Sequence, residues 1–291
     1  MKDRKIVVIG GGPAGISASL YTARAGIHTT VIGRDGGALA KTDKIENYYG
    51  FSQPVSGREL LEAGQQQARR LGVELVAGEV LSIGYLDRFT VTTKEQSLEG
   101  DAVILATGAS RSAPRIPGLE RLEGRGVSYC AVCDAFFYRG KDVAVLGSGE
   151  YALHEARELL PVAGSVTLLT NGGNLSGLGS ALPKEIQVVE KRLSQLEGED
   201  QLEAVVFEDG SRIPLAGLFV AVGVASSSDL ARKIGAAVEG SKILVNELME
   251  TTVPGLFAAG DCTGGLLQIS KAVYEGAKAA VEAIRFVRQE E

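Results

Sequence analysis

The sequence has few cysteines, and this scarcity excludes a secreted fold held together by disulfides. Of its 291 residues three are cysteine, and two of them, Cys130 and Cys133, form one CxxC pair. A zinc site would need two further Cys or His ligands. The remaining candidates are Cys262, His28 and His154, and none of these belongs to a second paired motif. In a reducing compartment the CxxC pair therefore indicates redox chemistry rather than zinc binding.

Long apolar runs and an excess of basic charge are also missing. No apolar run reaches the roughly 18 residues that a bilayer-spanning helix needs. The first residues, 1–5, lead directly into a predicted strand with no signal peptide before it. The net charge of −6 argues against bulk nucleic-acid binding. We therefore expect a cytoplasmic protein that binds neither membranes nor nucleic acids.

The chain contains two copies of a pattern that is typical of nucleotide-binding folds. A short apolar strand at 5–9 is followed by the glycine loop 10–15, a helical pattern and a second strand at 29–32. The same order returns with a strand at 142–146, the loop Gly147-Ser148-Gly149, a helix and a strand at 165–169. Each copy reads as a βαβ unit of a doubly wound parallel sheet.

These two units predict an α/β fold with two Rossmann-like domains, the second inserted into the first. A proline-containing stretch at 110–118 marks the first crossing between domains. From about Lys242 the residues resemble the first domain again, with a strand at 255–259 and a final helix at 268–288. We therefore predict one discontinuous domain at 1–112 plus 242–291 and an inserted domain at 113–241.

The first glycine loop has the features of a pyrophosphate site. Its glycines allow a tight turn and a close approach of the backbone to phosphate, at the N-terminus of a helix. Asp35, after the second strand, is suited to hold a ribose hydroxyl. The segments Ala106-Thr107-Gly108 and Gly260-Asp261 lie at carboxyl ends of predicted parallel strands, where ligands bind in such sheets. The alternative at each place is an ordinary turn without a ligand.

The segment Cys130–Asp134 carries the candidate redox chemistry. One thiolate of a CxxC pair attacks a disulfide, and the other resolves the mixed disulfide. A helix that begins near Cys130 would lower a thiol pKa, and Asp134 could exchange the proton. The alternatives are buried free cysteines, a metal knuckle and, for Asp134, a helix cap. Cys262 has no partner in sequence and is interpreted as structural.

Together these motifs resemble the low-molecular-weight thioredoxin reductases, along essentially the whole chain. The matching segments are Gly10–Gly15, Ile45–Gly50, Ala106–Ala109, Cys130–Asp134 with the Phe136–Tyr138 aromatics, and Gly260-Asp261. The resemblance implies FAD in the outer domain, with Asn47 and Ala38 near the isoalloxazine ring. It also implies a homodimer, a thioredoxin partner, Cys133 facing the flavin and Cys130 attacking the partner.

By the same resemblance, three residues are catalytic and the rest of the predicted site binds FAD. The catalytic residues are Cys130, Cys133 and Asp134. The predicted FAD-binding residues are Gly10, Gly12, Pro13, Ala14, Gly15, Arg34, Asp35, Ala38, Leu39, Ile45, Asn47, Val80, Ala106, Thr107, Gly108, Gly260, Asp261, Gln268 and Ile269.

The second glycine loop departs from the pattern of the NADPH-using members. They carry a His-Arg-Arg run after the second strand of the inserted domain, where this chain has Thr170–Asn174 and no cation to bind a 2′-phosphate. Glu150 and Tyr151 stand in the loop where small residues are usual, and Leu267 replaces an arginine before Gln268. The chain is more similar to the pyridine-nucleotide-independent branch, which includes the ferredoxin-dependent flavin thioredoxin reductases.

The leading hypothesis is therefore an FAD-dependent disulfide oxidoreductase that reduces thioredoxin or a thioredoxin-like protein, with reduced ferredoxin as donor. Three alternatives stay open: an NAD(P)H-dependent thioredoxin reductase with a diverged nucleotide site, a diflavin disulfide oxidoreductase, and a non-enzymatic flavin-binding redox sensor.

Overall fold

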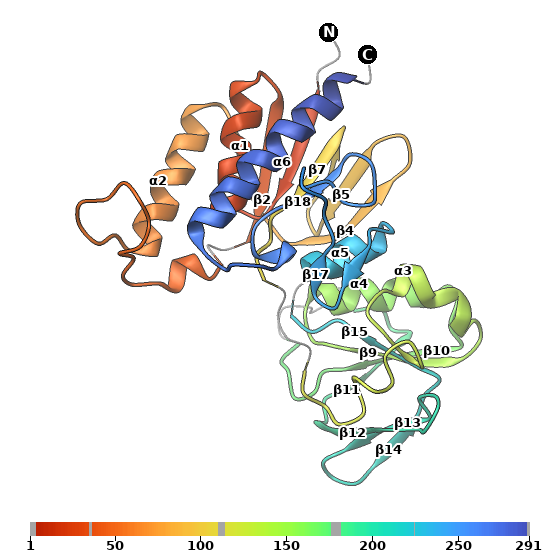
Figure 1. Ribbon diagram of the computed structural model, residues 1–291. Coiled ribbons are helices and arrows are strands. Elements are labelled where there is room, and N and C mark those ends of the chain that lie inside the picture. Colours follow the sequence, from red (N-terminus) through yellow and green to blue (C-terminus); the bar gives the residue numbers. More distant parts are fainter. Residues whose placement is uncertain (1–3, 35–36, 110–113, 176–181, 224, 290–291) are drawn as a thin grey trace. The chain divides into compact units, whose positions relative to one another are not determined.

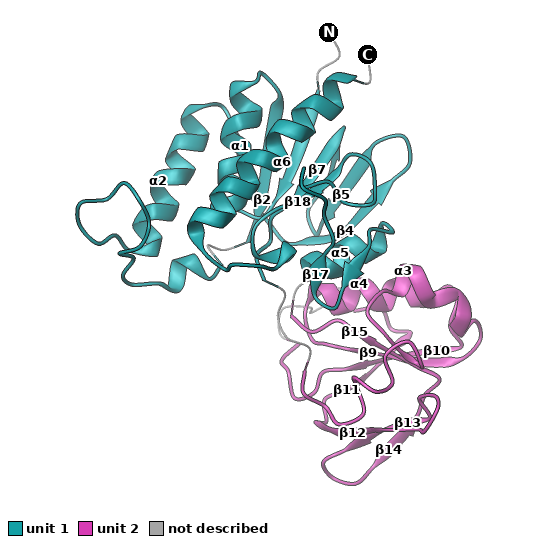
Figure 2. Ribbon diagram, viewed as in Figure 1, with its two compact units in different colours: residues 1–111, 226–291 teal, residues 112–225 magenta. Residues whose placement is uncertain are grey.

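The chain folds into two compact units, each with its own sheet. The computed structural model describes residues 4–34, 37–109, 114–175, 182–223 and 225–289. Unit 1 consists of residues 1–111 and 226–291, and unit 2 of residues 112–225 (Figure 2). Each unit contains a five-stranded parallel sheet and a three-stranded antiparallel sheet. The predicted α/β class with two Rossmann-like domains is confirmed.

Unit 1 is organised around its parallel sheet, which is buried on both faces. The strands are β1 (Lys5–Ile9), β2 (His28–Gly33), β3 (Glu74–Ala77), β7 (Ala102–Leu105) and β18 (Leu256–Ala258), in the order β18-β7-β1-β2-β3 (Figure 1). Helices α1 (Pro13–Arg24), α2 (Gly57–Arg70) and α6 (Ile269–Gln289) pack against this sheet. Continuous runs such as Ala102–Leu105 are fully buried because a parallel sheet is covered by other elements on both sides.

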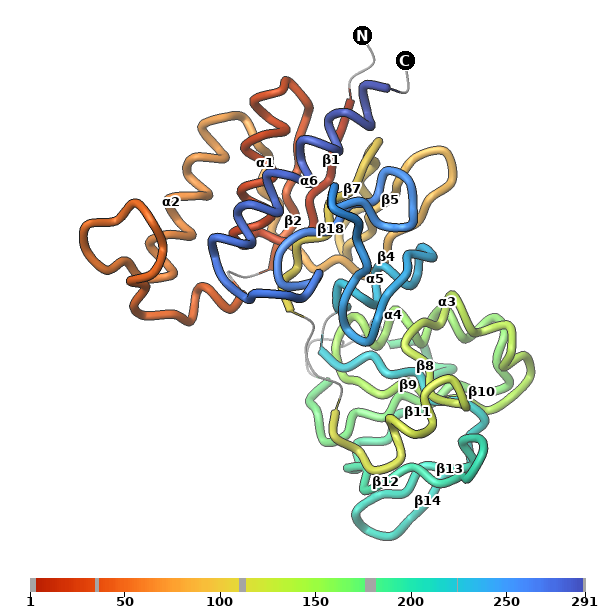
Figure 3. The backbone as a smooth tube through the Cα atoms, in the orientation of Figure 1, coloured from red at the N-terminus to blue at the C-terminus, as the bar shows by residue number. Residues whose placement is uncertain are grey.

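The rest of unit 1 consists of short elements around this core. An antiparallel sheet contains β4 (Val80–Tyr85), β5 (Phe89–Thr93) and β6 (Ser97–Gly100). The short helix α5 (Ser227–Lys233) and the pair β16 (Val238–Glu239) and β17 (Lys242–Ile243) follow the return from unit 2. Two 3-10 turns lie at Leu39–Lys41 and Asp261–Thr263. In Figure 3 the tube of α6 runs beside that of α1, and the two helices are in contact.

Unit 2 repeats this architecture on a smaller scale. Its parallel sheet has the order β11-β10-β9-β15-β8 and its antiparallel sheet the order β12-β13-β14. The strands are β8 (Val127–Ser128), β9 (Asp142–Leu146), β10 (Ser165–Leu169), β11 (Ile186–Val189), β12 (Leu193–Glu197), β13 (Ala204–Phe207), β14 (Arg212–Pro214) and β15 (Gly217–Val220). The helical segments are α3 (Ala131–Asp134), a 3-10 turn at Ala135–Tyr138 and α4 (Glu150–Leu159).

The C-terminal boundary of the inserted unit differs from the prediction. The sequence predicts residues 226–241 in the inserted domain, but in the structure they belong to unit 1. Ser226 starts α5 with a capping box, in which its side chain accepts from the Asp229 amide and the Asp229 carboxylate accepts from the Ser226 amide. The helix then packs on β4 and β17, and Lys233 donates to the Leu81 carbonyl at 3.0 Å. The chain therefore re-enters unit 1 at α5 rather than near Lys242.

The strand register brings predicted site residues of unit 1 to one edge of the sheet. Leu105 is paired with Ile9 on one side and with Ala258 on the other. Because the three strands are parallel, the segments that follow them emerge at the same carboxyl edge. Gly10, Ala106 and Gly260 therefore lie close together at this edge. Among the described residues, no helix is long and apolar enough to cross a membrane.

Candidate active site and cofactor cradle

Cys130 and Cys133 form a disulfide at the beginning of α3. Their Cα atoms are 5.3 Å apart, a separation that disulfides normally span. Cys130 is the N-cap of α3, and its sulfur accepts a hydrogen bond from the Cys133 amide at 3.1 Å. Cys130 is buried and Cys133 is exposed. The predicted order, with Cys130 attacking a partner, therefore requires Cys130 to become accessible, and it stays a prediction.

Asp134 lies beside this disulfide and is held by Ser128. The Ser128 hydroxyl donates to the Asp134 carboxylate at 2.7 Å and accepts from the Cys130 amide at 3.1 Å. Burial raises the pKa of Tyr138, and the charge of Asp134 adds to that rise. The structure therefore brings Cys130, Cys133 and Asp134 together, and it adds Ser128 as the residue that orients the carboxylate.

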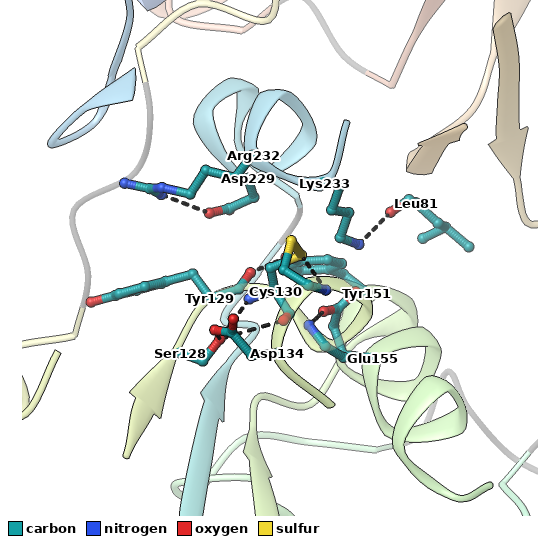
Figure 4. The surroundings of a disulfide bond; sticks show 12 residues. Leu81, Ser128, Tyr129, Cys130, Asp134, Tyr151, Glu155, Asp229, Arg232 and Lys233 are labelled. Carbon is teal, nitrogen blue, oxygen red and sulfur yellow. Dashed lines mark hydrogen bonds and ion pairs between the residues drawn. A yellow bond between two sulfur atoms is a disulfide. The ribbon is translucent and has the colours of Figure 1, made fainter. Parts of the chain in front are cut away.

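Glu155 is a second acid at the dithiol, and the sequence reasoning missed it. Its side chain is 1% exposed, and its Oε2 accepts from the Ala131 amide at 2.8 Å (Figure 4). The residue stands on the buried face of α4 together with Ala152 and Leu159. An acid at an apolar position of a helical pattern was the signal that could have identified it.

The first glycine loop leaves room for a ligand at the N-terminus of α1. Gly10 has φ +118°, and a Cβ on it would lie 2.2 Å from the Ala106 carbonyl oxygen. A Cβ on Gly15 would lie 1.8 Å from the Gly10 carbonyl oxygen, so neither position tolerates a side chain. A Cβ on Gly11 or Gly12 would meet nothing within 4 Å, and Gly12 caps α1 without a side-chain hydrogen bond. The tight turn, the open space and the uncapped helix fit the pyrophosphate of a dinucleotide.

The remaining predicted FAD-binding residues of unit 1 fall into two groups. One group gathers at the loop edge: Pro13 and Ala14 begin α1, Thr107 and Gly108 follow β7, Gly260 contacts Ala14, Asp261 follows Gly260, and Ile269 begins α6. Asn47 joins them by donating to the Gln268 side chain at 3.0 Å, across 221 residues of chain. The hydroxyl groups of Thr107 and Ser227 also form a hydrogen bond.

The second group lies further along the chain from the loop, on the segments 34–45 and β4. Ala38 caps the first 3-10 turn and Leu39 begins it. Ile45 forms a backbone β-bridge with Val55, and Val80 is buried in β4. Arg34 lies 3.7 Å from the Glu79 carboxylate. The predicted ribose ligand Asp35 is outside the described residues.

A partly buried ion pair that the sequence did not indicate holds the Gly260 loop. Lys271 donates to the Gly260 carbonyl at 2.8 Å and lies 3.0 Å from Glu275, whose carboxylate accepts from the Gly260 amide at 2.9 Å. Cys262 lies in the same loop, where burial raises its pKa to about 12. A thiol with this pKa is not a nucleophile at neutral pH, which agrees with a structural role.

The second glycine loop has the same backbone geometry as the first but different side chains. A Cβ on Gly147 would lie 2.2 Å from the Ala221 carbonyl oxygen, the same distance that separates a Cβ on Gly10 from the Ala106 carbonyl oxygen. Glu150 lies in the first turn of α4, where it places a carboxylate at a potential phosphate site. Tyr151 is 1% exposed, so its bulk is taken up by the unit 2 interior.

The loop after β10 has no cation of its own, but a neighbouring segment supplies one. The Asn171 side chain binds the backbone, because its Oδ1 accepts a hydrogen bond from the Leu193 amide at 2.8 Å. Arg192 lies beside Gly172, where a Cβ would come within 3.0 Å of its Nε. The Thr170 hydroxyl is buried and has no hydrogen-bond partner among the described residues. The prediction concerned the 170–174 segment itself, and it did not consider Arg192, which directly precedes β12.

Comparison with known proteins finds relatives along nearly the whole chain. Residues 4–276 match the family model described as pyridine nucleotide-disulphide oxidoreductase. A thioredoxin reductase of Aquifex aeolicus is 35% identical, covering 97% of this chain and 93% of its own length. A thioredoxin reductase of Listeria innocua is 33% identical, covering 98% of this chain and 94% of its own length.

Solved structures of two kinds are also similar. The atypical thioredoxin reductase TRi from Desulfovibrio vulgaris Hildenborough has a TM-score of 0.92 and 43% identity, with 99% of both chains covered. A ferredoxin-flavin thioredoxin reductase from Clostridium acetobutylicum has a TM-score of 0.72 and 31% identity, with 98% of both chains covered.

Proposed function

Because this chain belongs to the thioredoxin reductase-like pyridine nucleotide-disulphide oxidoreductases, we propose that it reduces thioredoxin or a thioredoxin-like protein with electrons from reduced ferredoxin. It is a flavin-dependent disulfide oxidoreductase, and its cofactor is FAD. In this proposal it acts in the cytoplasm as a homodimer. The observation that carries the donor assignment is the composition of the 170–174 loop, which has no Arg or Lys.

The residues of unit 1 fit FAD, and their proposed roles follow from their positions. The glycine loop and the N-terminus of α1 would hold the pyrophosphate, and Asp261 would bind a hydroxyl of the ribityl chain. Asn47 and Gln268, which already bond to each other, would lie at the isoalloxazine ring. FAD, when bound, supplies the electron pair that reduces the disulfide.

The dithiol residues then carry out exchange with the protein substrate. In the reduced enzyme the Cys130 thiolate attacks one sulfur of the thioredoxin disulfide, and the other thioredoxin sulfur leaves as a thiolate. The Cys133 thiolate next attacks Cys130, which restores the Cys130–Cys133 disulfide and releases the second thioredoxin thiolate. Asp134, fixed by Ser128, would donate a proton to a leaving thiolate. The two electrons lost by the dithiol are those gained by thioredoxin.

An exposed apolar surface beside the dithiol supports a protein substrate. Val132, Phe136 and Phe137 are 54%, 72% and 68% exposed, although all three are large hydrophobic side chains. Val132 stands between the two cysteines, and the phenylalanines follow Asp134 by two and three residues. A cluster of this kind is typical of a protein interaction surface.

NADPH should bind poorly to this protein. Two guanidinium contacts to a 2′-phosphate are worth about 1.5–3 kcal/mol each, and the 170–174 loop supplies none. Glu150 adds a carboxylate at the α4 N-terminus, where phosphate would bind. We expect titration calorimetry to give an affinity for NADPH at least about a hundredfold weaker than that of a thioredoxin reductase that makes both guanidinium contacts. A low-micromolar dissociation constant for NADPH would contradict this expectation.

Arg192 favours a second candidate function, an NAD(P)H-dependent thioredoxin reductase. Its side chain lies beside Gly172 and offers one cation to a ribose phosphate. If this function holds, Arg192→Ala should lower the affinity for NADPH, and Arg212→Ala, which removes an exposed cation of the same unit, should not. Equal NADPH affinities in the wild type and the Arg192 variant would dismiss this role.

The other two alternatives have their own signatures. Two flavins per chain would indicate a diflavin enzyme, and bound FAD without thiol exchange would indicate a redox sensor.

The proposed homodimer has a simple test. Light scattering should give about twice the chain mass of 30.4 kDa at working concentration. A mass equal to one chain would contradict the dimer.

A further inference from the structure

The buried carboxylate of Glu155 lies directly at the start of the dithiol helix. Its Oε2 accepts from the amide of Ala131, the residue that follows Cys130 and begins α3 (Figure 4). The side chain is 1% exposed, and an acid is almost never buried to this degree unless it is paired. Neither the exchange chemistry of the CxxC pair nor the cofactor cradle uses this residue.

We propose that Glu155 is a positioning residue that sets the reduction potential of the Cys130–Cys133 couple. The proposal rests on the proposed function only in taking this pair as the redox couple. Cys130 caps α3, and its sulfur already accepts from the Cys133 amide. That hydrogen bond favours a thiolate at Cys130. Glu155 opposes this by taking the Ala131 amide and by placing a negative charge in a buried site.

The direction of the effect follows from which redox form carries charge. The disulfide is neutral, whereas the reduced pair ionises when its pKa is near or below the ambient pH. A neighbouring carboxylate disfavours that thiolate and therefore destabilises the reduced form. A less stable reduced form means a lower reduction potential, hence a stronger reductant toward a partner disulfide. Asp134 is the other carboxylate here, and Ser128 binds it.

Glu155→Gln tests the charge while keeping the size and an oxygen that accepts from Ala131. The full FAD-loaded chain is equilibrated anaerobically at about pH 8, where CxxC thiols ionise, in buffers of reduced and oxidised dithiothreitol. In this exchange the protein disulfide gains two electrons and two protons from one dithiothreitol, which closes its own disulfide. Alkylation followed by mass spectrometry then counts free Cys130 and Cys133. Neither thioredoxin nor ferredoxin is present, so the result is independent of both assignments.

We expect the equilibrium constant for reduction of the disulfide to rise about tenfold in Glu155→Gln, which corresponds to about 30 mV. Glu158→Gln is the matched control, because Glu158 lies on the same helix and is exposed. Its equilibrium constant should equal that of the wild type. A Glu155→Gln constant within about twofold of the wild type, with the protein folded, would overturn the proposal and leave Glu155 a structural residue.

A measurement on the unaltered protein covers the case in which Glu155→Gln does not fold. Hydrogen exchange of the Ala131 amide should be slowed at least about a hundredfold relative to an unstructured peptide, because a buried carboxylate accepts that proton. Exchange at the unstructured rate would show that the hydrogen bond does not persist, and the proposal would fall. Thioredoxin reduction is a separate question. If thioredoxin is not reduced but the tenfold rise in the equilibrium constant and the slowed exchange of the Ala131 amide are both observed, the proposed substrate is wrong and Glu155 keeps its role.

Discussion

In a Cys130→Ser variant we expect thioredoxin reduction to fall by about a thousandfold or more, while FAD stays bound. A serine hydroxyl is not ionised at neutral pH and cannot form a disulfide with Cys133, so both the attack and its resolution are lost. The substitution is nearly isosteric in a buried position, so the fold of unit 2 should survive. The measurement is the steady-state rate of thioredoxin thiol formation, with flavin content determined on the same preparation.

Cys262→Ser is the control for this experiment. The Cys262 sulfur lies 3.3 Å from the Ala259 carbonyl oxygen and 3.5 Å from that of Leu105, so a hydroxyl finds acceptors in the same place. Because its raised pKa keeps this thiol protonated, we expect the control to retain thioredoxin reduction. Turnover in Cys130→Ser equal to that of the control would remove Cys130 from the reaction.

FAD binding should be lost when a carboxylate is placed at the first glycine loop. In Gly12→Glu we expect the affinity for FAD to fall about a hundredfold or more, because the new charge stands at the helix N-terminus that would hold the pyrophosphate. The backbone of Gly12 has φ −82° and a Cβ there meets nothing within 4 Å, so the fold does not require glycine at this position. Flavin content after purification and fluorescence titration of the apoprotein report the loss.

Gly84→Glu matches this change at a site without a ligand. Gly84 is exposed in β4, and a Cβ on it also meets nothing within 4 Å. This control should bind FAD like the wild type and melt at a similar temperature. If Gly12→Glu retains full FAD affinity, the pyrophosphate does not lie at this loop.

The parts of the site that the sequence predicted are those in which local chemistry determines position. Gly10 and Gly147 each need a backbone approach that a side chain would block, and this requirement is visible as a glycine after an apolar strand. The spacing of Cys130 and Cys133 likewise suffices to close a disulfide over one turn. The resemblance to a family assigned both Asn47 and Gln268 to the FAD site, but the hydrogen bond between their side chains was not predicted, because no local pattern indicates it.

The parts that the sequence did not predict depend on contacts between distant segments. Glu155 reaches the dithiol because α4 packs against α3, and a helical pattern does not identify the neighbour of its buried face. Arg192 reaches the loop at Gly172 from the start of another strand. The boundary at Ser226 was missed because α5 is a short helix whose attachment to unit 1 comes from β4 and β17 rather than from its own residues.

Electron donation by ferredoxin is tested most directly by anaerobic reduction of the FAD-loaded protein. Reduced ferredoxin, NADPH and NADH are mixed separately with the enzyme, with oxidised thioredoxin present in a parallel series. The flavin absorbance and the formation of thioredoxin thiols are followed over time. We predict that reduced ferredoxin bleaches the flavin and sustains thioredoxin reduction, whereas neither pyridine nucleotide does so on that time scale. Rapid bleaching and sustained turnover with NADPH, and none with ferredoxin, would contradict the donor assignment.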